Sequence, residues 1–264
     1  TYQWKKDGVD ITGEINVTLN ITDANATLHD GNYSVVVSND FGSKESEEVE
    51  LKVSDSLQNG LFAWYPLDQN ASDMSGNGNH GTPQNTPEFV TNNGKSYVTL
   101  QGSGVSTSNG DHILLPHNSF ANLTKISISG WINFESNSYD QNDWAGLIIL
   151  GEYYSGRFSI YVRSGGGTIS FGQKIGEFLL ETETGWNSFT VTSNEESTKL
   201  YYNGELKILS SDPYAGFSGS VAAIGRHWWS GSTATRLNGS IDDVRIYDRA
   251  LSAAEVQALY NLGQ

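Results

Sequence analysis

The sequence contains no cysteine and only one methionine and five prolines. The absence of cysteine excludes disulfide bonds, thiol nucleophiles and thiolate metal sites. Its five histidines show neither HxxxH nor HExxH spacing, which argues against a zinc site. Any metal bound by this chain is therefore expected to have oxygen ligands.

Basic residues are also scarce. Lys and Arg number 15 against 30 Asp and Glu, which gives a net charge of −15, and the longest basic cluster is the pair Lys5 and Lys6. Such a charge repels phosphate backbones and anionic lipids, so nucleic acid and membrane surfaces are not expected partners. The longest apolar run, residues 145–150, is far shorter than the roughly 20 residues of a spanning helix, so no membrane insertion is expected.

The pattern of apolar and polar residues favours an all-β protein. Apolar and polar residues alternate in short segments between turn residues such as Gly, Asn, Ser and Asp, whereas helical periodicity is nearly absent. One short helix is predicted over residues 253–260. Ser252 is its expected N-cap and Glu255 completes a capping box, while Leu251 and Val256 have the spacing of a hydrophobic staple.

A domain boundary is expected where an alternating strand, ending at residue 53, gives way to polar residues before the aromatic run at residues 61–65. Changes of this kind are typical of linkers. The predicted organisation is a domain over residues 1–54, a linker over 55–60 and a larger domain over 61–264.

The first segment contains YQWKKDG and HDGNYSVVVSNDFG. These strings resemble immunoglobulin-like domains, in which Trp4 would be the core Trp, Tyr33 the tyrosine corner and Val35 the position of a Cys in disulfide-bonded members. Alternation over residues 17–21 predicts another strand. Because the strands that should precede Trp4 are missing, residues 1–54 are expected to form a truncated immunoglobulin-like β-sandwich.

The second segment contains, in this order, LFAWYPLD, DMSGNGNHG, HILLPHNS, ISISGWINF, ETGWNSFTVT, KLYYNGELK, AAIGR and LNGSIDDVRIYDRALSAAEV. Together they resemble the laminin G-like domain of the concanavalin A-like lectin and glucanase superfamily, in the form common in modular bacterial secreted proteins. The resemblance implies a jelly-roll β-sandwich, covalently attached neighbouring domains and a secreted or cell-surface location. It also implies that Trp64, Trp131 and Trp186 lie in the core.

The loop DQNASDMSGNGNH, residues 68–80, concentrates oxygen donors among glycines. Calcium binds carboxylate, amide and carbonyl oxygens, and glycines allow the chain to turn around the ion. The spacing differs from that of an EF-hand loop, so a second segment must contribute, and SIDDVRIYD near the C-terminus is the expected source. We predict a structural Ca²⁺ with Asp73 and Asp243 as side-chain ligands. The alternative is an Asx-turn loop whose side chains cap its own backbone.

The remaining calcium ligands are expected to be Asn77 or Asn79 and the carbonyl of His80.

Several aromatic residues lie in stretches rich in Gly, Ser and Asp, where a large ring has no packing reason to exist. Sugars stack on aromatic rings while polar side chains bind their hydroxyl groups. Along residues 157–163, alternation places Ser159, Tyr161 and Arg163 on the face opposite the core. Alternatively, the rings fold down over a sheet edge as a lid. The predicted glycan-binding residues are Trp144, Tyr153, Tyr154, Tyr161, Arg163, Arg226, His227, Trp228 and Trp229.

Catalysis is not expected. The acidic strand motif E-x-D-x-E, which the resemblance associates with the glucanases, is absent, and the nearest pair is Glu181 and Glu183. Distance along a strand alone does not exclude this pair from glycoside hydrolysis. The preferred interpretation is a non-catalytic, calcium-stabilised carbohydrate-binding module of a larger protein. The alternatives are protein–protein adhesion through Trp228 and Trp229, an architectural spacer and, least favoured, a glycoside hydrolase or lyase.

Overall fold

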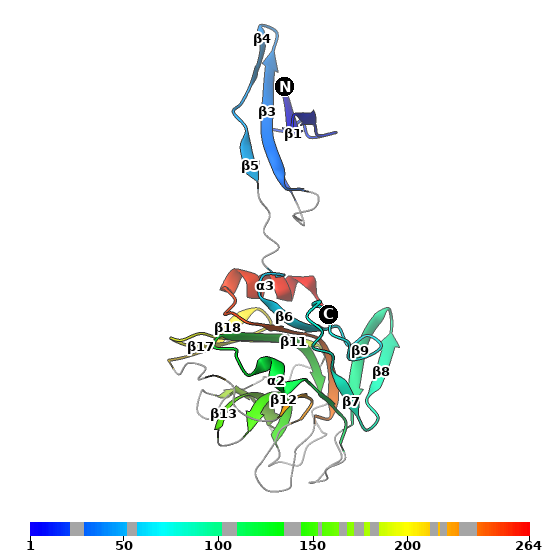
Figure 1. Ribbon diagram of the computed structural model, residues 1–264. Coiled ribbons are helices and arrows are strands. Elements are labelled where there is room, and N and C mark those ends of the chain that lie inside the picture. Colours follow the sequence, from blue (N-terminus) through cyan, green and yellow to red (C-terminus); the bar gives the residue numbers. More distant parts are fainter. Residues whose placement is uncertain are drawn as a thin grey trace. The chain divides into compact units, whose positions relative to one another are not determined.

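The computed structural model describes residues 1–21, 29–51, 57–101, 110–134, 144–152, 155–163, 168–171, 177–179, 185–211, 216, 221–226 and 237–264. The chain divides into two compact units, residues 1–59 and residues 60–264 (Figure 1). Regular structure is mostly β, and a short helix lies near the C-terminus, which confirms the predicted fold class.

The first unit is a five-stranded antiparallel sheet in which β1, β4 and β5 all pair with the central β3. Its strands are β1 (Tyr2–Lys6), β2 (Val9–Asp10), β3 (Gly31–Asn39), β4 (Gly42–Glu45) and β5 (Val49–Leu51). Trp4 lies opposite Val35 in the pairing of β1 with β3. The Tyr33 hydroxyl donates to the carbonyl of His29 at 2.8 Å, which is the hydrogen bond of a tyrosine corner.

The strand predicted over residues 17–21 is absent from the described structure, so that prediction was wrong. Val17 is 67% exposed. Alternating apolar residues form a strand only when a neighbouring strand supplies hydrogen bonds and a sheet supplies a face to cover. The preceding segment instead returns over β1, where the Trp4 indole Nε1 donates to the carbonyl of Asn16 at 3.0 Å.

The second unit is a sandwich of two antiparallel sheets. In the described residues, one sheet has seven strands in the order β15-β14-β13-β12-β19-β10-β7. Its strands are β7 (Thr82–Gln84), β10 (His112–Leu114), β12 (Trp144–Glu152), β13 (Ser155–Arg163), β14 (Thr168–Phe171), β15 (Glu177–Leu179) and β19 (Ala222–Ile224).

The other sheet has eight described strands, in the order β18-β17-β16-β11-β20-β9-β8, with β6 also pairing with β20. They are β6 (Leu61–Tyr65), β8 (Glu88–Asn92), β9 (Lys95–Leu100), β11 (Ile126–Phe134), β16 (Asn187–Ser193), β17 (Thr198–Tyr202), β18 (Glu205–Ser210) and β20 (Gly239–Tyr247). One hydrophobic core contains side chains from both sheets, among them Tyr65, Ile132, Phe189, Leu150 and Ile224.

Strand β20 organises the eight-stranded sheet. It pairs with β11 along one edge, whereas its other edge is shared by β9, opposite residues 239–241, and by β6, opposite residues 244–247. The first strand of the unit is thereby joined to its last. The change of partner falls at Asp242 and Asp243, where the pairing with β11 also shifts register and Asp243 has a φ of +44°.

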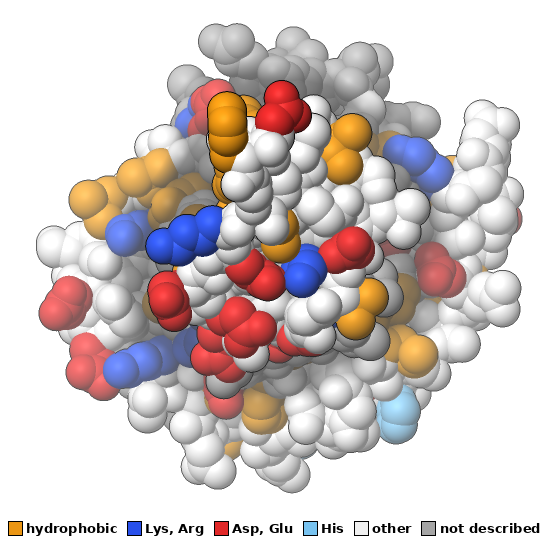
Figure 2. Space-filling view, turned by 90° about the horizontal axis from the view of Figure 1, so that it is seen from above, with side chains coloured by type: hydrophobic (Ala, Val, Ile, Leu, Met, Phe, Trp, Pro, Cys, Tyr) orange, Lys and Arg blue, Asp and Glu red, His pale blue; other side chains and the backbone are white. Residues whose placement is uncertain are grey.

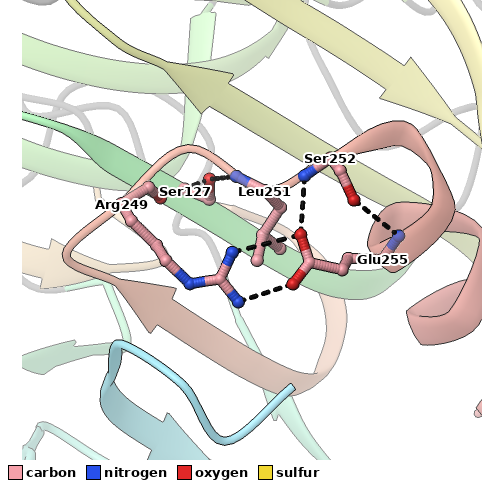
Figure 3. A network of polar contacts seen from close by, with 5 residues as sticks. All are labelled: Ser127, Arg249, Leu251, Ser252 and Glu255. Atoms are coloured by element: carbon pink, nitrogen blue, oxygen red, sulfur yellow. Dashed lines mark hydrogen bonds and ion pairs between the residues drawn. The ribbon is translucent and has the colours of Figure 1, made fainter. Parts of the chain in front are cut away.

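The predicted C-terminal helix is present as α3 (Ala253–Leu262), and a second helix, α2 (His117–Phe120), is a single turn. The expected capping box is formed: the Ser252 side chain accepts from the Glu255 N–H, and the Glu255 carboxylate accepts from the Ser252 N–H. Arg249 donates to both carboxylate oxygens of Glu255, at 2.7 and 3.1 Å (Figure 3).

Ser127 fixes the start of this helix on β11. Its hydroxyl donates to the carbonyl of Arg249 at 2.8 Å and accepts from the N–H of Leu251 at 2.9 Å (Figure 3). Val256 and Leu259 are buried beneath the helix. The eight-stranded sheet is therefore covered on both faces, by the seven-stranded sheet and by α3.

Of the three tryptophans expected in the core, Trp131 is buried and the other two are not. Trp131 is buried, but it stacks on Tyr260 of α3 with ring centroids 5.8 Å apart and lies outside the main core. Trp64 and Trp186 are only half-buried. An apolar position in a strand pattern predicts burial, but the pattern does not show which face of the sheet will be covered by a helix.

We expect Glu255→Gln to lower the free energy of unfolding by about 1–2 kcal/mol at neutral pH, since it weakens a cap and an ion pair. The hydrogen bond from Arg249 lowers the pKa of Glu255 to about 2 from 4.5. A lowered pKa stabilises the folded state above the unfolded-state pKa, and this stability is lost as the pH falls from about 5 towards 2. Urea unfolding at pH 7 and pH 3 measures both effects.

The variant should lose less stability than the wild type between these two pH values. Glu88→Gln, at an exposed position in β8, is the matched control. An acid dependence that is identical in the wild type and in Glu255→Gln would contradict this account of the helix start.

Candidate functional site

The loop after β6 is organised around the carboxylate of Asp73. Its Oδ1 accepts hydrogen bonds from the backbone N–H groups of Trp64 and Ser75, both at 2.9 Å. Its Oδ2 accepts a hydrogen bond from the backbone N–H of Asn79 at 2.8 Å. Burial by itself raises the pKa of Asp73, but the hydrogen bonds outweigh burial and the pKa lies below its ordinary value. Asp73 thus holds the loop as a charged hydrogen-bond acceptor.

The asparagines of the same loop fasten it to β6. The Asn77 amide donates to the carbonyls of Leu61 and Phe62, and the Asn79 amide donates to that of Phe62 at 2.9 Å. The carbonyl of Asn79 accepts from the buried Tyr65 hydroxyl at 2.6 Å. This is the self-capping arrangement of the Asx-turn alternative. His80 is exposed, and its Nδ1 accepts from the N–H of Asp73 at 3.1 Å.

Asp243 meets the loop through Trp64. The indole Nε1 of Trp64 donates to Asp243 Oδ1 at 2.6 Å, and Arg245 Nε donates to the same oxygen at 3.1 Å. The Arg245 guanidinium also lies 4.8 Å from the centroid of the Trp64 ring. Trp64 therefore contacts both predicted calcium ligands, Asp73 with its backbone and Asp243 with its side chain.

The structure brings the loop and the last strand together, but it uses the two carboxylates for hydrogen bonds to protein N–H groups. Over the described part of the chain, no group of three or more His, Asp or Glu side chains could hold a metal ion. The calcium ion and its ligands remain a prediction.

Asp242, the neighbour of Asp243, occupies the more unusual environment. It is 6% exposed, its Oδ2 accepts from Gln264 Nε2 at 3.2 Å, and burial raises its pKa to about 7. Sequence reasoning selected Asp243 because alternation along an unbroken strand directs it away from the core. Burial along β20 follows that alternation from Asp242 to Ile246, since Asp242 and Val244 are buried and Asp243 is half-buried.

The predicted glycan-binding residues are only partly described. Trp144 and Arg163 are register partners in the pairing of β12 with β13, and Tyr161 is the partner of Gly146 two positions away. The backbone therefore brings these three positions to one end of the strand pair. Tyr161 is half-buried, and burial lowers the pKa of the half-buried Arg226 after β19.

The other predicted positions lie outside the described residues, and so do the acids Glu181 and Glu183. They are Tyr153, Tyr154, His227, Trp228 and Trp229.

Part of the outer face of the seven-stranded sheet, the face opposite the core, is covered. Ile149, Ser159 and Ala223 lie side by side on β12, β13 and β19, and each is fully buried. Ser159 was predicted on the face opposite the core, and it is fully buried there. An alternating pattern predicts that a residue points away from the core but cannot show what covers the outer face.

We expect Asp73→Ala to reduce the free energy of unfolding by about 3 kcal/mol, because it leaves backbone N–H groups without an acceptor. Asp73→Asn keeps one oxygen able to accept the Trp64 and Ser75 N–H groups and should cost less. Urea unfolding followed by tryptophan fluorescence measures both variants. Equal losses would show that the hydrogen bonds do not account for the role of Asp73.

Several solved structures are similar in fold to this chain. Domain 4 of AbnA, a GH43 extracellular arabinanase from Geobacillus stearothermophilus solved with arabinotriose, matches with a TM-score of 0.57 and 20% identity, over 76% of this chain and 98% of that domain. The binding domain of botulinum neurotoxin DC in complex with SialylT matches with a TM-score of 0.60 and 16% identity, over 79% of this chain and 52% of that one.

The same toxin domain in complex with rat synaptotagmin II matches with a TM-score of 0.59 and 17% identity, over 78% of this chain and 52% of that one. No curated protein matches the sequence. Within the described residues, no helix is long and apolar enough to cross a membrane.

The model of the Concanavalin A-like lectin/glucanases superfamily matches residues 107–257. The chain therefore belongs to the concanavalin A-like lectin/glucanase superfamily.

Proposed function

We propose that the second unit is a non-catalytic carbohydrate-binding module of a larger secreted or cell-surface protein. The observation that carries this proposal is the match to 98% of an arabinanase domain whose solved structure contains arabinotriose. The resemblance spans nearly all of that domain, which is one domain of an extracellular arabinanase. A module of this kind would hold an attached catalytic domain or a cell close to polysaccharide, and several weak sites would act together.

The net charge of −15 favours neutral sugars over sulfated or uronic-acid polymers. We assign the contact to the end of the β12–β13 pair, where Trp144, Tyr161 and Arg163 come together in the backbone register. Trp228 and Trp229, which follow Arg226 in the sequence, are proposed as further aromatic contacts with the sugar. Aromatic rings would stack on the sugar, and Arg163 and Arg226 would bind hydroxyl groups.

Receptor binding is the second candidate, since a related toxin domain is solved with rat synaptotagmin II. A protein interface of ordinary size requires a buried apolar centre. On the face shown in Figure 2, hydrophobic side chains occur in several separate groups among acidic, basic and other polar ones.

A polysaccharide screen on the purified chain tests the proposal. We expect retardation in affinity gels by at least one neutral polysaccharide, and about tenfold weaker binding by the Trp228→Ala/Trp229→Ala variant, because two stacking rings are removed. Trp131→Phe, altered beneath α3, is the control for general damage. Capture of a protein receptor with no retardation by any glycan would favour the second candidate.

The same screen in calcium and in EGTA tests the predicted ion. A structural calcium ion should raise the melting temperature and be required for full binding only through folding. A melting temperature unchanged by EGTA, on protein shown to be metal-free by elemental analysis, would contradict calcium binding.

A further inference from the structure

Helix α3 covers only part of the outer face of the eight-stranded sheet. Trp131 of β11 stacks on Tyr260 where the helix crosses this face. Asn133, two residues further along β11, points to the same face by alternation and is half-buried. Its register partner on β20 is Ser240, which is also half-buried. Beyond Trp131 the outer face therefore continues with polar side chains that solvent can reach.

Strand β9 extends this face on the other side of β20. Val98 and Leu100 lie in the core, so Tyr97 and Thr99 point outward by alternation, and both are half-buried. The hydroxyl groups of Thr99 and Ser240 are 3.0 Å apart and form a hydrogen bond. Because a hydroxyl can donate once and accept twice, this pair still has a proton and lone pairs to offer to a ligand.

Trp186 reaches the same face from the opposite side. It precedes β16, and its ring centroid lies 5.1 Å from that of Tyr97, with 63° between the ring planes. In the order β16-β11-β20-β9, two strands separate these residues, a span of roughly 14 Å at the backbone. The rings therefore reach towards each other across β11 and β20, where Asn133 and Ser240 have short side chains. Both rings are only half-buried.

Two aromatic rings, two hydroxyl groups and one amide thus share one surface. We name it the outer-face patch, and its residues are Tyr97, Thr99, Asn133, Trp186 and Ser240. None of the five side chains carries a formal charge. Sugars present apolar C–H faces that stack on aromatic rings, and hydroxyl groups that pair with amides and hydroxyls. The carboxylate of exposed Glu88, the register partner of Thr99, disfavours anionic sugars at the rim.

We propose that the outer-face patch is a second saccharide-binding site, and that it takes a neutral oligosaccharide. This assignment rests on the proposed function, because the second unit must bind carbohydrate for a second site to exist. Trp186 and Tyr97 stack on the sugar ring. The Asn133 amide and the hydroxyl pair of Thr99 and Ser240 bind its hydroxyl groups.

The hydrophobic core separates this patch from the site at the end of the β12–β13 pair. That pair belongs to the seven-stranded sheet, whereas the patch lies on the outer face of the eight-stranded sheet. One chain would therefore hold two saccharide chains at once, or bind twice within a dense polysaccharide. Two weak contacts joined in one protein bind more tightly than either does alone.

Isothermal titration calorimetry with neutral hexasaccharides of glucose, xylose, mannose and arabinose counts the sites. We expect the wild type to bind its preferred hexasaccharide at two sites per chain. Trp186→Ala should weaken one of them by about tenfold, because it removes a stacking ring. Trp228→Ala/Trp229→Ala should weaken the other, and the combined variant should be weakened at both.

Asn133→Ala tests the patch without removing a ring. It should weaken the same site by about fivefold through lost hydrogen bonds, and it keeps the test valid if Trp186→Ala does not fold. Leu206→Ala is the matched control, since it removes an exposed side chain from β18 at the other edge of the same sheet. This control should bind as the wild type does. Melting temperatures report whether each variant is folded.

Two outcomes would overturn the second site and leave the proposed function in place. One is a single site per chain that Trp228→Ala/Trp229→Ala weakens. The other is binding that neither Trp186→Ala nor Asn133→Ala changes. A wild type that binds no hexasaccharide in the calorimeter and no polysaccharide in affinity gels would contradict the proposed function, and the second site with it.

Discussion

The pairing of the last strand of the sandwich with the first is the constraint on which the rest of the second unit depends. Strand β20 lies inside the eight-stranded sheet, between β11 on one edge and β9 and β6 on the other. Until it is in place, the sheet cannot close and α3 has no surface to cover. Pairing strands this far apart in the sequence closes a long loop, and burial of the core has to offset the chain entropy that this costs.

Several acidic residues of the second unit serve the fold. Asp73 accepts N–H groups that would otherwise be unpaired in its loop, Asp243 joins β20 to the side chain of Trp64, and Glu255 closes the helix start with Arg249. Each carboxylate is matched by N–H donors. Asp242 is the exception, since one of its oxygens is buried without a hydrogen-bond partner.

The sandwich of the second unit is the scaffold that would hold a functional site. Membership of a superfamily that includes both lectins and glucanases does not by itself decide between binding and catalysis, because function resides in the site. Within the described residues, the β12–β13 register brings Trp144, Tyr161 and Arg163 to one end of a strand pair, which is the kind of placement that a sugar-contacting site requires.

The sequence by itself determined the local elements: the all-β class, the capped helix beginning at Ala253, the tyrosine corner of Tyr33 and the self-capping loop kept as an alternative. Each of these features depends on residues close together in the chain. Its hydrogen bonds and its hydrophobic periodicity can therefore be predicted from the sequence. Only the tertiary structure decided which faces are covered. Trp131 lies under α3, Ser159 is closed off, the expected strand at residues 17–21 is not formed, and Gln264 donates to Asp242, because these outcomes depend on strands and helices distant in sequence.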